Sequence, residues 1–349
     1  MLHVVLETTR QRGQGRKHLE LRVDTEAPVP VTQARLRVSG MYGLGDFAYV
    51  KLVQEALGTM GFRPDVIHCN ITLPTGLAAL WLRRVLQVPC LLTEHTGDYM
   101  WFYGRRRLTL LKARMVLRGV DMVMPVSEGQ GQLMTMSTLE PRGRYTVVPN
   151  AVDPDIFSPG PARSPDGTIR ALTVGSLLPV KGHEYLLRAY ARLSEESRNR
   201  LHILIVGDGS LRDDLLLLRA ELGIDEGVTI ESGGRPRSEI ARLMRDCSFY
   251  VQPSVREATP CVIVESMACG KPVLATRCGG SEYLVGPETG VVVEKADVDA
   301  LVGGLQAMIE RYHLFDSELI TRHASEKYSY EAVGGQYDEI YRSITAVNP

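Results

Sequence analysis

The chain has 349 residues, of which 44% are hydrophobic, and its formal net charge is -1. This length exceeds what one small hydrophobic core serves, so we expect two domains. The nearly balanced charge argues against nucleic-acid binding, which usually needs a basic surface. No apolar run in the sequence approaches the roughly 18 residues that a membrane span requires.

Six scattered cysteines indicate reduced thiols rather than a disulfide framework or a zinc site. None of them forms a Cys-x-x-Cys pair, which structural zinc sites typically use. The N-terminal segment is already polar at Glu7 and Arg10, which does not match a secretory signal peptide. We therefore expect a cytoplasmic protein whose cysteines are mostly buried.

Strands and helices alternate along the first half of the chain. Such alternation predicts parallel sheets with helices on both faces. A segment rich in proline, glycine and aspartate, Pro149–Gly167, then predicts a hinge between two domains. The predicted strands are 65–68, 89–93, 121–126 and 145–148, and the predicted helices are 76–86, 105–118 and 128–138.

The alternation resumes after the hinge and ends in a helix near 330–345 with three tyrosines. The sequence therefore predicts an α/β fold of two Rossmann-like domains that face a cleft. We expect residues 1–153 to form the first domain and 154–328 the second. The final helix, within 329–349, is expected to pack back on the first domain. The predicted strands are 169–174, 201–206, 228–231, 248–252 and 271–276, and the helices are 183–193, 211–222, 238–245 and one after Thr259.

The loop after the second predicted strand carries a candidate functional histidine, His95, within Thr93–Asp98. Ligands of parallel sheets bind beyond the carboxyl ends of the strands. His95 could hydrogen-bond a sugar or polarise a leaving group across the cleft. It could equally satisfy carbonyl groups of its own loop, and the functional interpretation depends on a ligand held by the second domain.

The predicted helix at 105–118 combines basic and apolar residues. A basic amphipathic helix can lie on an anionic membrane. The same composition also fits a solvated face above a stripe of core residues. The basic residues are Arg105–Arg107, Lys112, Arg114 and Arg118, and the apolar ones include Leu108, Leu110, Leu111, Val116 and Leu117.

Two glycine-containing turns follow strands of the second half. In Gly175–Gly182 the glycines allow close backbone approach and Lys181 supplies a charge for a phosphate, although a plain turn with a solvated lysine is the alternative. The second turn, Gly207–Arg212, imitates a dinucleotide-binding motif but lacks its third glycine. It therefore indicates a nucleotide-facing backbone turn more than a nicotinamide site.

Residues 253–280 contain two glutamates around a predicted helix start. Thr259 is the expected N-cap and Pro260 the expected first helical residue. Glu257 then stands at the loop mouth beside a helix N-terminus, which favours anions. Glu265 lies about a turn and a half inside the same helix. This layout suits a ligand with hydroxyls at two ends and a phosphate between them, such as a nucleotide sugar.

Taken in order, these segments resemble the family 4 retaining glycosyltransferases of the GT-B fold over roughly residues 60–345. The two-glutamate segment is the most specific match. That family usually opens with a strand, a glycine-rich loop and a helix. No such opening is visible before Asp65, and Gly43–Gly45 is a poor substitute for the glycine-rich loop. The first domain is therefore expected to lack its opening strand–helix unit. The matching pieces are DVIHCN (65–70), TEHTGDY (93–99), PVSEGQ (125–130), VVPNAVD (147–153), VGSLLPVKGHEYL (174–186), VGDGSLR (206–212), residues 253–280, GGSEYLV (279–285) and TG (289–290).

The resemblance implies that the second domain holds a nucleotide sugar, with no cofactor and no bound metal. Glu265 would bind the ribose hydroxyls, Glu257 would face the transferred sugar and Lys181 would meet the diphosphate. His95 would approach the donor from the first domain and complete the catalytic set. Further donor-binding residues would be Ser176, Gly207, Thr259, Gly279 and Gly280.

The implied function is a retaining transfer of a sugar to a glycan, lipid or small-molecule acceptor. The acceptor would return onto the face of the sugar from which the phosphate leaves. The protein would act in the cytoplasm, with peripheral contact at the inner face of the membrane as a further option. The alternative is a catalytically impaired nucleotide-sugar-binding or interaction protein with a truncated acceptor domain.

Overall fold

The structure is a computed structural model of the chain. It describes residues 2–9, 18–24, 31–39, 50, 54, 57–58, 61, 63–97, 103–104, 106–136, 144–160 and 168–346, with the backbone alone for 2–9, 18–24, 31–39 and 136. The predicted turn at Gly43–Gly45, the motif ends Asp98 and Tyr99, the basic residue Arg105 and part of the predicted hinge lie outside the described residues.

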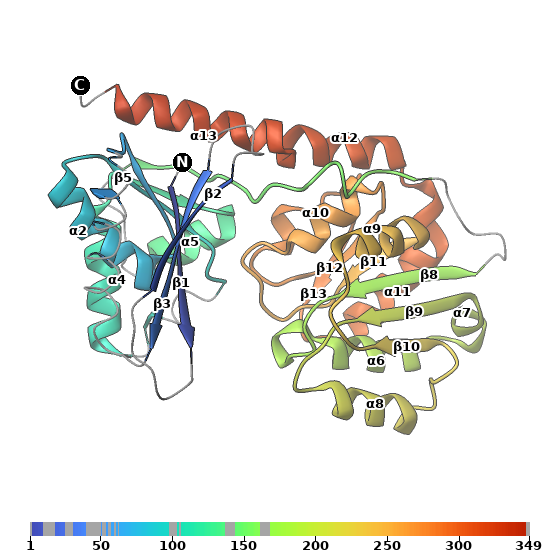
Figure 1. Cartoon of the computed structure of the whole chain (residues 1–349). Helices are drawn as coiled ribbons and strands as arrows, with labels where there is room; N and C mark the ends of the chain where they lie inside the picture. The colour runs from blue at the N-terminus through green and yellow to red at the C-terminus, as the bar shows by residue number, and fades with distance from the viewer. Residues whose placement is uncertain are drawn as a thin grey trace.

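The second half of the chain is built on a six-stranded parallel sheet with the strand order β10-β9-β8-β11-β12-β13 (Figure 1). Apolar, often β-branched runs form these strands because they are covered on both faces. The chain order reverses between β8 and β11, and such a switch point is where parallel sheets bind ligands. The strands are β8 (Ile169–Val174), β9 (Leu201–Val206), β10 (Val228–Glu231), β11 (Phe249–Gln252), β12 (Val273–Arg277) and β13 (Gly290–Glu294).

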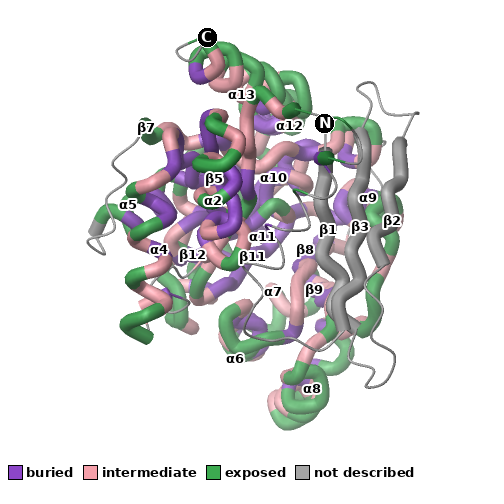
Figure 2. Tube along the Cα trace, turned by 60° about the vertical axis from the view of Figure 1, so that its left-hand side comes forward, coloured by how far each residue is buried: buried purple, intermediate pink, exposed green. Residues whose placement is uncertain are grey.

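Helices cover both faces of this sheet and enclose two hydrophobic clusters. Buried positions follow the strands and the inner sides of the helices, whereas exposed positions lie outside on helices such as α8 and α13 (Figure 2). One face carries α6 (His183–Ala191), α8 (Arg212–Glu221) and α11 (Val298–Arg311), and the other carries α9 (Arg237–Asp246), α10 (Cys261–Ala268) and α12 (Ser317–Tyr328). A short helix, α7 (Glu195–Arg200), precedes β9.

The first half contains a second parallel sheet, of order β4-β5-β6-β7, with helices on one face. Its strands are β4 (Ile67–Asn70), β5 (Cys90–Glu94), β6 (Met122–Pro125) and β7 (Arg144–Tyr145). The π-helical turn η1 (Thr72–Gly76) leads into α2 (Leu77–Leu86), which is followed by α4 (Arg107–Gly119) and α5 (Glu128–Met136).

The last helix, α13 (Tyr330–Thr345), crosses from the second half to the free face of this sheet (Figure 1). Its buried residues join a cluster with Leu91 and the β6 methionines. Tyr341 contacts the ring of His68, with the phenol oxygen 2.6 Å from Nδ1, and His68 Nε2 lies 2.7 Å from the Thr93 hydroxyl. Burial lowers the pKa of His68 to about 4, assisted by the nearby His95.

The N-terminal residues form a separate three-stranded sheet that the sequence analysis did not predict. Its strands are β1 (Leu2–Thr9), β2 (His18–Asp24) and β3 (Val31–Ser39), and β3 is central. Strand β3 pairs in parallel with β1 and antiparallel with β2. The expected lack of an opening strand–helix unit remains a prediction.

In the described part of the chain, two segments cross between the two halves, and they lie side by side. The backbone N–H of Val152 donates to the Tyr328 carbonyl oxygen at 2.7 Å, and Val152 forms a parallel bridge with Ser329. The second crossing is the junction of α12 and α13, where the Ser329 hydroxyl accepts the N–H of Ala332 and caps α13. The two connections therefore form one short paired segment.

The predicted α/β class with two parallel sheets is confirmed. The strands predicted at 169–174, 201–206 and 228–231 agree with the structure residue for residue. The strand predicted at 145–148 is limited to Arg144–Tyr145, and α7, α11, α12 and β13 were not predicted. Among the helices within the described ranges, none combines the length and apolar composition that a membrane crossing requires.

Candidate active site

The turns after β8 and β9 are in direct backbone contact beyond the carboxyl ends of these strands. A side chain at Gly207 would collide with the carbonyl oxygen of Gly175, and one at Gly209 would collide with that of Leu177. The glycines of the second turn are therefore needed for this close approach. The N–H of Gly207 donates to the carbonyl oxygen of Glu231 at 3.0 Å, so the amide of this predicted donor-binding residue is used within the sheet.

A 3-10 turn, η2 (Pro179–Lys181), brings Lys181 to the loop that follows β11. Gly182 has a φ of 66°, and a side chain there would collide with the Pro253 carbonyl oxygen, so glycine permits both the turn and the contact. Across this contact, Lys181 Nζ lies 2.6 Å from Glu257 Oε1. The fold thus joins two predicted site residues into one ion pair.

The Glu257 carboxylate is held by a buried polar network. Its Oε1 atom also accepts hydrogen bonds from Gln252 Nε2 at 2.9 Å and from the Ser254 hydroxyl at 2.8 Å. Gln252 Oε1 in turn accepts the hydroxyl of Tyr250 at 2.9 Å. Glu257 Oε2 makes no hydrogen bond with any described residue. One oxygen therefore fixes the carboxylate while the other remains available to a ligand.

Ser176 lies between β8 and η2, in the same turn that presents Lys181. Its carbonyl oxygen accepts a hydrogen bond from Nε2 of the buried His183 at 3.3 Å. Burial lowers the pKa of His183 to about 4, so its imidazole is neutral at pH 7, and the carbonyl acceptor requires the tautomer with the proton on Nε2. The contact secures the turn beneath Lys181.

Helix α10 begins one residue later than predicted. Its first residue is Cys261, and Pro260 occupies the N-cap position without a side-chain hydrogen bond. The hydroxyl of Thr259, the predicted N-cap, donates instead to the carbonyl oxygen of Val126 in the first half at 3.2 Å. The N-cap assignment of Thr259 is therefore wrong, because its hydroxyl serves a contact between the two halves.

Glu265 lies on α10 one turn beyond Cys261, and its side chain is 16% exposed. Arg237 approaches it, with Nη2 3.7 Å from Glu265 Oε1 and Nη1 3.5 Å from Asp153 Oδ2. The guanidinium also stacks over the Phe157 ring, 5.2 Å from its centroid. Burial raises the pKa of Glu265, and Arg237 partly opposes this shift.

The two glutamates influence the same neighbouring groups. Burial is the largest cause of the raised pKa of both Tyr250 and Cys261, and both carboxylates raise these pKa values further. Tyr250 and Cys261 therefore lie within electrostatic reach of both carboxylates.

The Gly279–Gly280 turn after β12 lies against the loop that contains Glu257. Gly279 has a φ of 106°, and a side chain at Gly280 would collide with the Ala258 carbonyl oxygen. The N–H of Gly279 already donates to Glu282 Oε2 at 3.0 Å. This amide can serve a ligand only if Glu282 releases it.

His95 lies on the loop after β5, and its Nε2 is 3.1 Å from Asn70 Oδ1. Desolvation by surrounding atoms lowers the pKa of His95, whereas the charge of Glu94 and the polar side chain of Asn150 raise it. The side chain of Asn150 also lowers the pKa of the Cys261 thiol, which burial raises. Asn150 therefore lies close to both the candidate histidine of the first half and the start of α10.

Loops from the two halves meet directly around Glu257. A side chain at Gly97 would lie 3.0 Å from the backbone nitrogen of Ala258, which follows Glu257. The Ser127 hydroxyl donates to the Ala258 carbonyl oxygen at 2.8 Å. A side chain at Gly129 would collide with the carbonyl oxygen of Gly279. The carboxyl ends of both parallel sheets therefore face one another.

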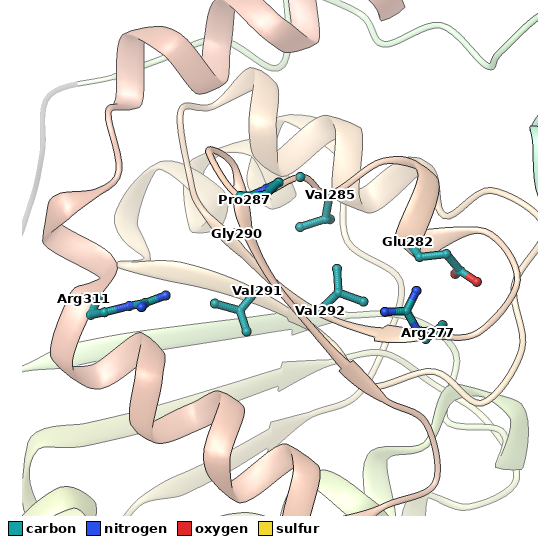
Figure 3. A pocket seen from close by; sticks show the side chains of 9 residues that line it. Arg277, Glu282, Val285, Pro287, Gly290, Val291, Val292 and Arg311 are labelled. Carbon is teal, nitrogen blue, oxygen red and sulfur yellow. The ribbon is translucent and has the colours of Figure 1, made fainter.

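A separate hollow of about 370 Å³ opens beside the edge strand β13 (Figure 3). It is lined by Val291, Arg277 and Arg311 among others. Glu282 is also in its lining, and this residue contacts the candidate site by accepting the N–H of Gly279. Nε of Arg277 is paired with Glu294 at 3.0 Å. The predicted site residues do not line this hollow.

Sequence reasoning did not single out several residues that support the site. The alternation Tyr250-x-Gln252-x-Ser254 places three polar groups on one side of a strand end, and this pattern is visible in the sequence. The contacts of Arg237 and Asn150 depend on the packing of distant segments, and no local signal predicts them.

Comparisons with known proteins cover nearly the whole chain. A model of the family described as Glycosyl transferases group 1 matches residues 157–331. A model described as Glycosyl transferase 4-like domain matches residues 2–151. The boundary between the two matches falls close to the first crossing between the two halves.

Several known proteins are similar to this chain over most of its length. The D-inositol 3-phosphate glycosyltransferase of Corynebacterium jeikeium is 28% identical over 316 residues, which cover 81% of this chain and 73% of the relative. The MMP alpha-(1->4)-mannosyltransferase of Mycolicibacterium hassiacum is 30% identical over 307 residues, covering 81% and 72%. The structure of sucrose-phosphate synthase from Thermosynechococcus elongatus superposes with a TM-score of 0.79 at 22% identity, covering 93% of this chain and 86% of that one.

Proposed function

The chain belongs to the glycosyl transferases group 1 family, and from this we propose that it transfers a sugar from a nucleoside diphosphate sugar with retention and without a bound metal. The predicted family and the GT-B fold class are confirmed. The protein is therefore a glycosyltransferase with a sugar-nucleotide donor. The residues that hold the donor, the stereochemistry and the acceptor are the proposed part.

The Lys181–Glu257 ion pair is the observation that carries the proposal. Its two charges lie 2.6 Å apart beyond the strand ends, next to the loop of His95. A diphosphate is a stronger anionic partner for Lys181 than a single carboxylate. When a donor binds, Lys181 would turn to the diphosphate while Gln252 and Ser254 keep Glu257 oriented toward the sugar.

The proposed reaction breaks the bond between the anomeric carbon and the phosphate oxygen. The sugar gains oxocarbenium character, and the nucleoside diphosphate departs with the electron pair. Lys181 stabilises this developing negative charge, the kind of electrostatic contribution that is usually the largest in catalysis. The acceptor hydroxyl then bonds to the anomeric carbon on the same face, and its proton passes to the departing phosphate oxygen.

The remaining predicted residues are assigned to the donor. We propose that Glu265 accepts the ribose hydroxyls, because an ionised carboxylate forms strong hydrogen bonds with such donors. His95 would approach the transferred sugar from the first half. The turns and helix start around the diphosphate would contribute through Ser176, Gly207, Thr259, Gly279 and Gly280.

Release of nucleoside diphosphate from nucleotide sugars tests this proposal. The purified chain is incubated with UDP-, GDP- and ADP-sugars, with and without candidate glycan, lipid and phosphorylated small-molecule acceptors. We expect release from at least one donor in the presence of EDTA. The anomeric configuration of any product, determined by NMR, tests retention directly.

The alternative, a nucleotide-sugar-binding protein with impaired catalysis, makes a different prediction in the same experiment. It predicts donor binding by calorimetry without any release of nucleoside diphosphate. If the chain neither binds any of the three donor classes nor releases nucleoside diphosphate from them, both functions are contradicted.

Replacing Glu265 with glutamine is expected to weaken donor binding by about 1–3 kcal/mol, the range of a charge-assisted hydrogen bond. Calorimetric titration with the donor measures the loss, and Glu294→Gln on the edge strand is the matched control. Burial raises the pKa of Glu265, so this carboxylate is protonated at a higher pH than an ordinary glutamate. As the pH is lowered, wild-type donor affinity should therefore begin to fall earlier. Unchanged affinity in Glu265→Gln would remove this residue from the donor site.

We further propose that the protein acts at the cytoplasmic face of a membrane through the outer surface of α2 and α4. These helices are in contact, and neither contains an acidic residue. Exposed apolar side chains lie beside basic ones, which matches an anionic lipid surface. The exposed residues are Trp81, Val85, Leu108, Leu111 and Met115, with the basic residues Arg84, Arg106, Arg107 and Arg118.

Exchanging Arg84 and Arg107 together for glutamine is expected to weaken binding to anionic vesicles by about 2 kcal/mol, at roughly 1 kcal/mol for each basic residue. Flotation with phosphatidylglycerol and with phosphatidylcholine vesicles measures the effect. The matched control exchanges Arg192 and Arg322, which are exposed on the second half. Equal binding to neutral vesicles, or no loss in the double variant, would contradict the membrane contact.

A further inference from the structure

Glu94 is a fully buried carboxylate at the carboxyl end of β5. Its Oε1 atom accepts the backbone N–H groups of His95 at 2.9 Å and Thr96 at 2.7 Å. Its Oε2 atom accepts the N–H of Thr72 at 2.8 Å and also the hydroxyl of Thr72. One side chain therefore ties the start of the His95 loop to the turn that follows β4.

These contacts fix the backbone on both sides of the His95 side chain. The amide of His95 and the amide after it point to one oxygen, so the His95 Cα is held between two anchored peptide groups. Further along the loop, the carbonyl oxygen of Thr96 accepts Nε2 of Gln130 at 2.9 Å. The loop then reaches Gly97, which abuts the backbone next to Glu257. The chain of contacts from Glu94 thus ends at the candidate donor site.

A second carboxylate, that of Asp121, anchors the opposite end of β5 and serves as a structural comparison for Glu94. Asp121 accepts the N–H of Cys90, the first residue of β5, at 2.9 Å, and it pairs with Arg83 at 2.6 Å. It braces the strand far from the loop, whereas Glu94 braces the loop itself. The two acids therefore allow stability and positioning to be separated by experiment.

We propose that Glu94 is a positioning residue that sets the place of the His95 imidazole relative to the donor sugar. This inference rests on the proposed glycosyl transfer. Glutamine at position 94 has one oxygen instead of two, so it cannot accept all the backbone N–H groups that the carboxylate accepts. The loop would then lose part of its anchoring while the donor-binding residues of the second half stay unchanged.

The glutamine variant also removes a negative charge beside His95. Glu94 raises the pKa of His95 against the lowering effect of desolvation. Loss of the carboxylate should therefore lower the pKa of His95 further, which a change in stability alone would not do.

The test compares Glu94→Gln with Asp121→Asn in the full chain. For Glu94→Gln we expect kcat to fall about 10²-fold, as for a small misplacement of a catalytic group. Its donor dissociation constant should change less than about twofold, as expected when the loss falls in the transition state rather than in donor binding. Asp121→Asn should lower the melting temperature but leave kcat per folded molecule unchanged. NMR titration of histidines labelled at Cε1, with the His95 signal identified through His95→Ala, should show the lower pKa in Glu94→Gln alone.

Thr72→Val keeps the test decisive if Glu94→Gln does not fold. It removes the hydroxyl that donates to Oε2 and should reduce kcat in the same direction by a smaller factor, without a change in donor affinity. Equal losses of kcat in Glu94→Gln and Asp121→Asn, or a wild-type kcat in Thr72→Val, would overturn the positioning role. A wild-type chain without transferase activity would instead contradict the proposed function, and the His95 titration could still be measured.

Discussion

Replacement of Lys181 by methionine is expected to lower kcat about 10²–10³-fold, the range for loss of one group that stabilises charge in the transition state. Methionine keeps much of the length of the side chain but removes the cation that would meet the departing phosphate. Glu257 would also lose its partner at 2.6 Å. Steady-state release of nucleoside diphosphate measures kcat, and the exposed Lys295 provides a matched lysine-to-methionine control.

A double variant distinguishes loss of catalysis from loss of the ion pair. Lys181→Met leaves the Glu257 carboxylate uncompensated, which is destabilising for a partly buried charge. Adding Glu257→Gln should recover part of the melting temperature but none of the activity. If Lys181→Met alone retains wild-type kcat and donor affinity, Lys181 does not bind the diphosphate.

Replacement of His95 by alanine is expected to lower kcat about 10²-fold, at the lower end of the range for a side chain that acts on the reacting groups. The donor dissociation constant should stay nearly unchanged, because the residues assigned to donor binding lie in the second half. Calorimetry and steady-state kinetics on one preparation separate the two quantities, with His313→Ala as the control. A variant with wild-type turnover would remove His95 from the mechanism.

The pH profile of the wild-type enzyme adds a second criterion for His95. Desolvation lowers its pKa, so the neutral imidazole persists to a lower pH than it would in an ordinary histidine. If the neutral form is active, kcat should decline only below the usual histidine pKa of about 6.5. The decline should be absent from the residual activity of His95→Ala.

Much of the six-stranded sheet could be predicted because its strands are continuous apolar runs between clear turn signals. β8 and β9 are such runs, and both were located to the residue. Helix α11 was not predicted, and it contains the unfavourable pair Gly303 and Gly304. Glycine at position 304 lets the helix approach the sheet closely, since a side chain there would press on Leu274 and Val293. Tertiary packing thus overrides the local propensity at this position.

The sequence predicted which residues belong to the candidate site better than it predicted the contacts between them. Lys181 and Glu257 were both singled out, but their pairing depends on the approach of Gly182 to the Pro253 carbonyl group. The partner of Thr259 lies 133 residues away in the sequence, so local helix-capping rules assigned its hydroxyl to the wrong acceptor. Such contacts follow only from the mutual placement of the two sheets.

The paired crossing of the chain restricts how the two halves can move. Helix α12 is packed on the sheet of the second half and α13 on the parallel sheet of the first half, and they meet at Ser329, which is bridged to Val152. Any rotation of one half must bend both crossings at this point, so they act together as a single pivot. A rotation about this pivot would open the site to substrate in one direction and bring the catalytic groups of the two halves together in the other.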